Sequence, residues 1–461
     1  MTHQDFKRKN GNERLLGMSV SFVLCMSFFL ASCSKSDMVA VIDSVLPEQE
    51  TNFYKVSEEE AKEKLSAFMN RFDSKSLDEV STRSSSTRTI SNIQAYRVDK
   101  RKVSRFASEE KLDDDLSTID TLLYLMNFEN NSGFALVSAD NRSKYPVLAI
   151  IDEGAMSLDD LSKSDNPGFI LFFNQSIAYM LQDIADVKSR EARAENENEI
   201  ETRSQIWYTL PPRLKTKWGQ RAPYNDYSPN SYPAGCVIIA FAQAISHFQT
   251  ISDVAWLDLR PGFGGIGSSV LNWNQIITDC ESSIGGYGKL NRDLTPTSAD
   301  QVAHLVRYLG SNFNANYTSS GTSANSTNAL NFVKSYLGLS SSTGFQSYSL
   351  YGVRDALVNY PNCLILSEGY AKKTSSGFLG LVITYSEGHD WIIDGSQYEQ
   401  MSPGVNGLYV HCNWGWNGRC DGYYASDVFN TGNGPVFLDP NDAGGTEGYN
   451  FIYENKYAVL K

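Results

Sequence analysis

The stretch Tyr232-Pro-Ala-Gly-Cys-Val-Ile-Ile-Ala-Phe-Ala-Gln-Ala-Ile-Ser-His-Phe248 decides the fold. Proline and glycine placed just before an uninterrupted apolar run mark a tight turn that enters a helix. The run therefore predicts a helix that begins at Cys236. Free N–H groups and the helix dipole favour a thiolate at that end of a helix. Cys236 is our candidate nucleophile.

Two downstream segments carry candidate partners for this thiol. His389 lies in Gly388-His-Asp-Trp-Ile-Ile-Asp-Gly395, a strand pattern bounded by glycines, and Asn413 follows in His411-Cys-Asn-Trp-Gly-Trp-Asn-Gly418. Cysteine, then histidine, then asparagine is the order of a Cys–His–Asn protease. The asparagine amide would bond to the imidazole nitrogen that faces away from sulfur and so fix its tautomer. The indole of Trp414 would shield that bond from water.

The other histidines fit the role of base less well. His247 shares the predicted helix with Cys236, but at 1.5 Å per residue it lies about 16 Å along it, too far for proton transfer. His304 falls among apolar residues of a second predicted helix over 298–309. His411 stays open as an alternative base, and Asp394 as an alternative to Asn413, which would make a Cys–His–Asp acyltransferase.

Acyl transfer also needs hydrogen-bond donors for the oxyanion. The backbone N–H of Cys236 supplies one. We expect the second from the side-chain amide of Gln220, in Lys217-Trp-Gly-Gln-Arg-Ala-Pro-Tyr-Asn225. Gln243 lies about two turns along the nucleophile helix, and we expect it to be structural.

The composition narrows the classes of partner. The chain has 461 residues, a net charge of −13 and a hydrophobic content of 41%. This length suggests about two or three domains, and the acidity argues against a nucleic-acid partner. His411, Cys412 and Cys420 lack the C-x-x-C spacing of a zinc site, so we predict no metal and no cofactor.

The cysteines that follow the N-terminal region are odd in number: Cys236, Cys280, Cys363, Cys412 and Cys420. At least one thiol of an exported protein would then be unpaired. One nucleophile with two disulfides, and one nucleophile with four buried thiols, both stay open.

The N-terminus has the layout of a secretory signal. Basic residues (Lys7, Arg8, Lys9 and Arg14) precede a mostly apolar run over 15–31. The sequence Leu-Ala-Ser-Cys33 ends it and resembles a bacterial lipobox, in which the cysteine is lipidated. We expect residues 1–33 to be a signal peptide and Cys33 to anchor an exported protein in the outer membrane or at the cell surface. Release after processing stays open.

Residues 34–203 contain secondary-structure signals of their own. Ser57 and Glu60 form a capping box, 122–137 reads as a hairpin with an Asn-rich tip, and 169–184 has a helical apolar face. The charged stretch 185–203 lacks a core pattern and is the best domain boundary. Its arginines are candidate cleavage sites, with Arg203 first and Arg193 second.

Residues 204–461 contain the candidate site. A helical part precedes strand patterns at 362–367, 379–385, 390–394, 408–413 and 453–460. This layout is α+β.

Several of these segments resemble the streptopain family of cysteine peptidases (family C10), whose catalytic domain is papain-like. The resemblance rests on Gly235-Cys-Val, Ala240-x-Ala-Gln243, Gly388-His, Ile393-Asp-Gly395, Asn413-Trp-Gly-Trp416, Leu271-Asn-Trp-Asn-Gln-Ile276 and the glycine-rich 432–449. Gly133-Phe-Ala-Leu-Val-Ser-Ala-Asp-Asn-Arg142 resembles the propeptide of that family, so the similarity spans roughly 53–461.

The resemblance implies a zymogen. Cys236 would be the nucleophile, His389 the base and acid, Asn413 and Trp414 its supports, and Gln220 the second oxyanion donor. Residues 34–203 would be an α+β prodomain that inhibits the catalytic domain 204–461, and the substrates would be proteins or peptides. Ile238, Ile239 and Phe241 are bulkier than the small residues expected after the nucleophile. The rival hypotheses are a non-catalytic surface-binding lipoprotein and a transglutaminase-type acyltransferase.

Overall fold

The computed structural model describes much of the chain beyond its N-terminal region. The described residues are 53–74, 88–97, 119–161, 164–185, 187, 206–258, 265–282, 287–341, 343–376, 382–402, 405–430 and 454–461. Glu50–Lys461 forms one compact unit, and Met1–Gln49 lies outside the described residues, as do Cys33, Arg193, Arg203 and 432–449. Among the described residues no helix is long and apolar enough to cross a membrane.

The described residues 53–187, which we call the N-terminal segment, form helices and an antiparallel sheet. The elements are α1 (Glu58–Ser74), β1 (Ile90–Arg97), β2 (Thr121–Phe128), β3 (Phe134–Ser138), β4 (Val147–Ile151), α4 (Leu158–Leu161) and α5 (Pro167–Ala185). The capping box is confirmed, because Glu60 Oε2 accepts from the Ser57 backbone N–H at 2.7 Å and Ser57 Oγ accepts from the Glu60 N–H at 3.2 Å. The hairpin is confirmed too, with Asn130 and Asn131 at positive φ in its tip.

The rest of the chain begins with a mostly helical part. It contains β5 (Ile206–Leu210), α7 (Cys236–Phe248), β6 (Asp253–Asp258), β7 (Gly265–Val270), α8 (Trp273–Glu281), α9 (Pro296–Asn312), β8 (Asn316–Tyr317), β9 (Thr322–Ser323), α10 (Ser326–Tyr336) and α11 (Leu350–Asn359). The helix predicted over 298–309 is the centre of α9.

The strand-rich part follows and completes the α+β layout predicted from the sequence. Its strands are β10 (Gln346–Ser347), β11 (Leu364–Ser376), β12 (Val382–Ser402), β13 (Val405–Asn413), β14 (Gly422–Ala425) and β15 (Glu454–Leu460). The prediction of two separate strands at 379–385 and 390–394 is wrong, because β12 runs through Glu387 and Gly388 while paired with β11.

One sheet joins the two parts of the chain, in the order β1-β2-β3-β4-β14-β13-β12-β11-β15-β10 with β5 also on β12. The junction is the antiparallel pairing of β4 with β14. The predicted boundary at 185–203 lies almost wholly outside the described residues, so the division into a prodomain and a catalytic domain stays a prediction.

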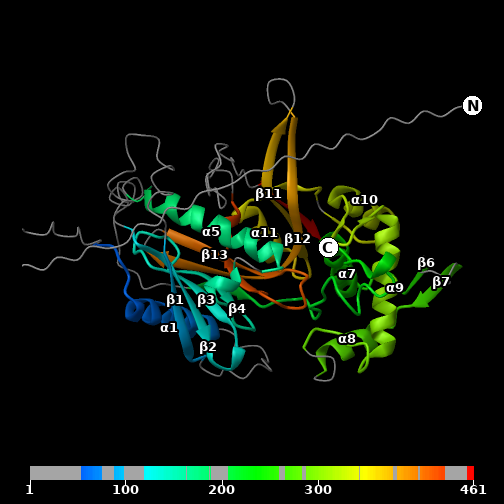
Figure 1. The fold of residues 1–461 in the computed structure, drawn as a ribbon, viewed down its shortest axis with the longest axis horizontal. Helices are drawn as coiled ribbons and strands as arrows, with labels where there is room; N and C mark the ends of the chain where they lie inside the picture. Colours follow the sequence, from blue (N-terminus) through cyan, green and yellow to red (C-terminus); the bar gives the residue numbers. More distant parts are fainter. Residues whose placement is uncertain are drawn as a thin grey trace, which may run out of the picture. The chain divides into compact units, whose positions relative to one another are not determined.

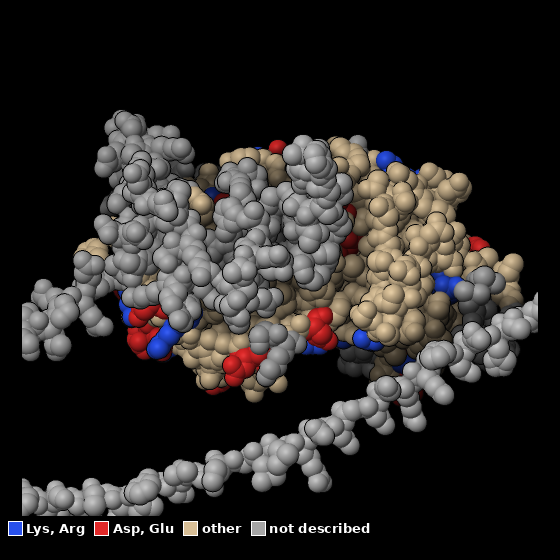
Figure 2. All heavy atoms as spheres, turned by 45° about the horizontal axis from the view of Figure 1, so that its top comes forward, with Lys and Arg blue, Asp and Glu red and all other residues tan. Residues whose placement is uncertain are grey.

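The strands have a different hydrophobic core on each face. Trp391 and Ile393 of β12 belong to a core that includes residues of α5, whereas Ile392 belongs to a core built on α7. Adjacent residues of a strand point to opposite faces. Figure 1 shows α5 crossing the sheet near β12 and β13, with α7, α9 and α10 on the other side of the long strands. Acidic and basic side chains are interspersed on the face in Figure 2.

Candidate active site

Cys236 is the first residue of α7, as predicted. Gly235 precedes it with φ of 96°, a left-handed conformation that glycine adopts without strain. A Cβ at Gly235 would also come within 2.8 Å of the Thr322 carbonyl oxygen. Both constraints favour glycine at this turn, and the turn fixes where the thiol emerges.

The thiol is protonated in this structure. Burial, and then the nearby charge of Asp390, raise the pKa of Cys236 to about 12, against backbone hydrogen bonds from Asp390 and the start of α7. The helix N-terminus therefore favours thiolate as expected, but burial outweighs it. An imidazolium partner would be needed to reverse the balance.

His389 is buried, with 1% of its surface exposed. Its Nε2 lies 2.8 Å from the Trp414 carbonyl oxygen, and its Nδ1 has no hydrogen-bond partner among the described residues. A carbonyl oxygen only accepts, so Nε2 carries the proton and Nδ1 is the bare nitrogen. Burial lowers the pKa of His389 to about 4, which leaves the imidazole neutral.

His389 and Cys236 lie on opposite faces of the sheet. Asp390, the next residue of β12, contacts the thiol, so strand alternation directs His389 to the other face. There the imidazole stacks on Trp391 with ring centroids 6.5 Å apart. The first turn of α5 closes on it, since a Cβ at Gly168 would come within 2.5 Å of His389 Cδ2. The thiol and the imidazole are both present but are not assembled as a pair.

Asn413 does not bond to the imidazole in this structure. Its Oδ1 accepts from Gln243 Nε2 at 3.0 Å and from the Gly415 N–H at 3.1 Å, and its Nδ2 donates to the Thr216 carbonyl at 2.8 Å. The Trp414 carbonyl takes the place expected for the Asn413 amide. Sequence reasoning missed this contact because every residue has a backbone carbonyl and nothing in the sequence marks which one will be used.

Gln220 lies beside the turn that precedes the nucleophile. Its carbonyl oxygen accepts from the Ala234 N–H at 2.9 Å. The neighbouring Trp218 N–H donates to Gln243 Oε1 at 2.9 Å, which ties this segment to α7 and gives Gln243 the structural role expected of it. The oxyanion role of the Gln220 side chain stays a prediction.

The hydrogen-bond partners of His411 do not suit a general base. Its Nδ1 lies 2.6 Å from Asp394 Oδ1 and its Nε2 lies 3.4 Å from Asp152 Oδ2. Burial lowers the pKa of His411, but the two carboxylates outweigh it and raise the pKa to about 10. His411 is thus an imidazolium without a free nitrogen. Asp394 is engaged by His411 and does not orient His389.

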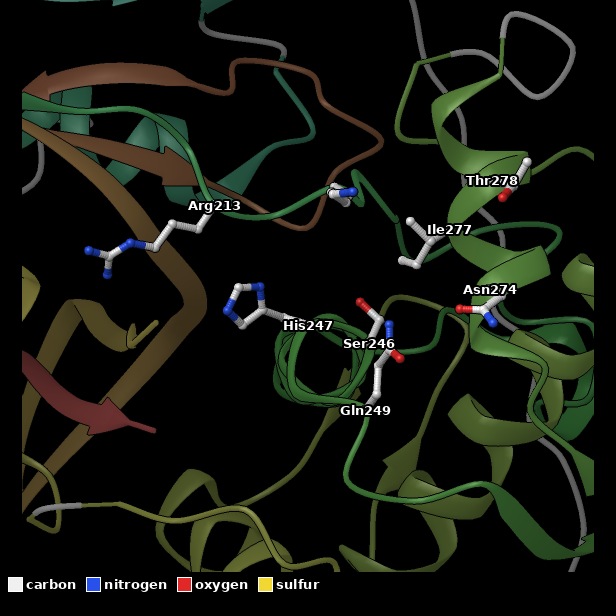
Figure 3. Close-up of a pocket in the computed structure, with 8 residues that line it drawn as sticks. Arg213, Ser246, His247, Gln249, Asn274, Ile277 and Thr278 are labelled. Atoms are coloured by element: carbon white, nitrogen blue, oxygen red, sulfur yellow. The ribbon is translucent and has the colours of Figure 1, made fainter. Parts of the chain in front are cut away.

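The remaining two histidines also lie away from the thiol. His304 stacks on Trp256 with 4.2 Å between the ring centroids, so it occupies a packed position. His247, near the C-terminal end of α7, lines an open cavity of about 490 Å³ with residues of α8 (Figure 3). The cations at this cavity already have partners, because Arg213 donates to the Leu357 carbonyl and Lys215 pairs with Glu281. The cavity is at the wrong end of α7 for catalysis.

The five cysteines of the described residues are all free, and apart from Cys236 they are buried. This is the arrangement of one candidate nucleophile with four buried thiols. Within the described ranges no group of three or more His, Cys, Asp or Glu side chains is placed to hold a metal ion.

Comparison with known proteins gives one family match, and it spans this site. Residues 218–424 match the sequence model of the Peptidase C10 family, a span that contains all five candidate catalytic residues and confirms the resemblance there. A mutant fragment of Prevotella intermedia prointerpain A is 20% identical over 73% of this chain and 94% of its own, with a TM-score of 0.44. Active wild-type interpain A cysteine protease from the same organism is 22% identical over 56% of this chain and 98% of its own, with a TM-score of 0.35. No curated protein matches.

Proposed function

We propose that this chain is a cysteine endopeptidase made as an inactive zymogen, with Cys236 as nucleophile and His389 as general base and acid. The match of residues 218–424 to the Peptidase C10 family supports the reaction class. The separation of thiol and imidazole on two faces of one sheet supports the zymogen, and it is the observation that carries the proposal.

In the active state the bare Nδ1 of His389 would meet the thiol. The proton of Cys236 Sγ passes to Nδ1, and the thiolate attacks the peptide carbonyl carbon. The Cys236 N–H and the Gln220 amide donate to the oxyanion. His389 then gives its proton to the leaving amine. A water that loses a proton to His389 attacks the thioester, which releases the carboxylic acid and restores the thiol.

The Trp414 carbonyl prepares the imidazole for this cycle. In the inactive arrangement it accepts from Nε2–H at 2.8 Å, which keeps Nδ1 unprotonated and able to take the thiol proton once activation brings the two groups together. Trp391 and Trp414 exclude water from that bond, since both are fully buried.

Contacts of the N-terminal segment hold the inactive arrangement. Besides the β4–β14 pairing, Glu153 pairs with Lys289 at 2.8 Å, Asp152 lies 3.7 Å from Lys217, and Lys144 pairs with Asp427 at 2.5 Å. Release therefore requires more than one bond to break. We propose that cleavage in 185–203, first at Arg203 and second at Arg193, frees this segment.

We also propose that the protein is exported and anchored through a lipid on Cys33, as the lipobox-like Leu30-Ala-Ser-Cys33 suggests. The anchor would hold the zymogen at the outer membrane or the cell surface until processing.

The test compares two forms of the protein. One is the full chain with an uncleavable linker, in which Lys188, Arg190, Arg193 and Arg203 are replaced by Gln and the glutamates of 185–203 by Asn. The other is the chain with its natural linker. We expect peptide hydrolysis only after the natural linker is cut, and none from a Cys236→Ala chain. If the uncleavable chain hydrolyses peptides as fast as the cut one, the zymogen hypothesis is wrong.

A further inference from the structure

A row of charged side chains lies beside Cys236 that the mechanism above does not use. Asp390 on β12 is paired directly with Glu368 on β11, and Glu368 with Lys456 on β15. Directly opposed residues of neighbouring antiparallel strands share a face. Asp390 is the member of the row whose backbone hydrogen-bonds the Cys236 sulfur.

The single cation of this row is shared. Lys456 Nζ lies 2.9 Å from Glu454 Oε1 and 3.8 Å from Glu368 Oε1. Glu368 and Asp390 are only 5% and 4% exposed, and Ser326 at the start of α10 hydrogen-bonds with both. No cation within the described ranges forms a salt bridge with Asp390.

One oxygen of Asp390 is left without a partner. Asp390 Oδ2 is buried and has no hydrogen-bond partner among the described residues. Buried polar atoms in proteins are nearly always hydrogen-bonded, and an unsatisfied one costs free energy. Burial, and then the charge of Glu368, raise the pKa of Asp390. A bound cation would supply both the missing donor and the missing charge.

The position of Asp390 indicates where that cation comes from. Asp390 follows the proposed base His389 directly, and its backbone hydrogen-bonds the Cys236 sulfur. A peptide whose carbonyl carbon reaches that sulfur brings its neighbouring side chains to Asp390. A guanidinium fits best, because its planar donors bind a carboxylate through two hydrogen bonds.

We propose that Asp390, backed by Glu368, binds a basic side chain of the substrate next to the scissile bond, so that the enzyme prefers peptides with arginine or lysine there. This inference rests on the proposed function and names its substrate class. The linker of the chain itself offers such side chains in Arg190, Arg193 and Arg203. Self-processing at the linker is then a consequence of the same preference.

The test uses the full chain, matured in reducing buffer by a glutamyl endopeptidase that is inhibited before the assay. Peptides of one sequence carry arginine, or its neutral analogue citrulline, at one position at a time on both sides of the scissile bond. We expect kcat/KM at one position to favour arginine roughly 10- to 100-fold, the range for a hydrogen bond to a charged group. Asp390→Asn should bring that ratio to within about 2-fold of unity.

The controls separate selectivity from folding and from the proposed function. Asp253→Asn changes an exposed aspartate on β6 and should keep the arginine preference. Thermal unfolding shows whether Asp390→Asn is folded, and the ratio measured on the wild-type chain stands without any variant. Equal rates on arginine and citrulline peptides overturn the inference, as does a preference that survives Asp390→Asn. Failure to cleave any peptide overturns the proposed function instead.

Discussion

Gly168 is where the N-terminal segment presses on the proposed base, so a methyl group there should weaken the closed state. A Cβ at Gly168 would come within 2.2 Å of Trp414 Cε3 and 2.5 Å of His389 Cδ2. Neither ring has room to give, because Trp414 and His389 are 0% and 1% exposed. Overpacking of this kind costs about 1–3 kcal/mol. Ala is also the better helix former, so any loss must come from the contact and not from α5 itself.

This free-energy cost should appear as a faster alkylation of Cys236. At about 1.4 kcal/mol per factor of ten, Gly168→Ala should raise the open fraction roughly 5- to 150-fold. The open fraction is read from the rate at which iodoacetamide alkylates Cys236 in the uncut chain at pH 7, since the other described cysteines are buried. Alkylation should accelerate by that factor, because an opened His389 can reach the thiol and form the thiolate.

A matched control is Gly344→Ala, whose added Cβ would meet nothing within 4 Å. It should leave the alkylation rate at the wild-type value. The reasoning is refuted if Gly168→Ala alkylates at the wild-type rate and unfolds at the wild-type temperature, because α5 would then not be what keeps the imidazole from the thiol.

Three further predictions follow from the site and the leader. In the matured enzyme His389→Ala should abolish hydrolysis without a change in unfolding temperature beyond a few degrees. His411→Ala should instead destabilise the fold by about 3–5 kcal/mol, since it removes the ion-pair partner of the buried Asp394 side chain. Denaturant unfolding and peptide assays distinguish the two, and the reverse pattern would exchange their roles. The pKa of His411 is raised from 6.5 to about 10 on folding, so protonation of this side chain stabilises the folded state. That stabilisation is full below pH 6.5 and is lost as the pH rises through 10. The unfolding temperature should therefore fall over that window in the wild type and fall less in His411→Gln, and equal slopes would contradict this. Cys33→Ala should move the exported protein from the membrane fraction to a soluble one, and unchanged partitioning would reject the anchor.

Signals that act within a few residues predicted the fold well. The capping box at Ser57, the hairpin tip at Asn130 and the helix that starts at Cys236 all appear where the sequence places them. Each depends on backbone conformations and hydrogen bonds that neighbouring residues decide alone. The candidate nucleophile could be identified from the sequence for the same reason.

Features that depend on contacts between distant parts of the chain could not be predicted from the sequence. The sequence breaks expected near Glu387 and Gly388 do not end a strand, because β11 pairs with β12 along its length. The Trp414 carbonyl, not the Asn413 amide, holds the imidazole. The sequence indicates only that Asp390 lies in a strand. The tertiary structure brings it to the thiol.

Local backbone freedom and distant packing also limit where β12 can move if the proposed zymogen is activated. Beyond His389 the strand is fixed, because Trp391, Ile392 and Ile393 are fully buried on both faces. A register shift there would put apolar side chains of both cores on the wrong face. The residue before His389 is a glycine, and a Cβ at Gly388 would come within 2.6 Å of the Tyr370 ring. Gly388 thus combines the backbone freedom of a glycine with close packing against the Tyr370 ring. If activation brings the imidazole from α5 to the thiol as proposed, we expect the chain to turn at this residue, with Asp390 left beside Cys236.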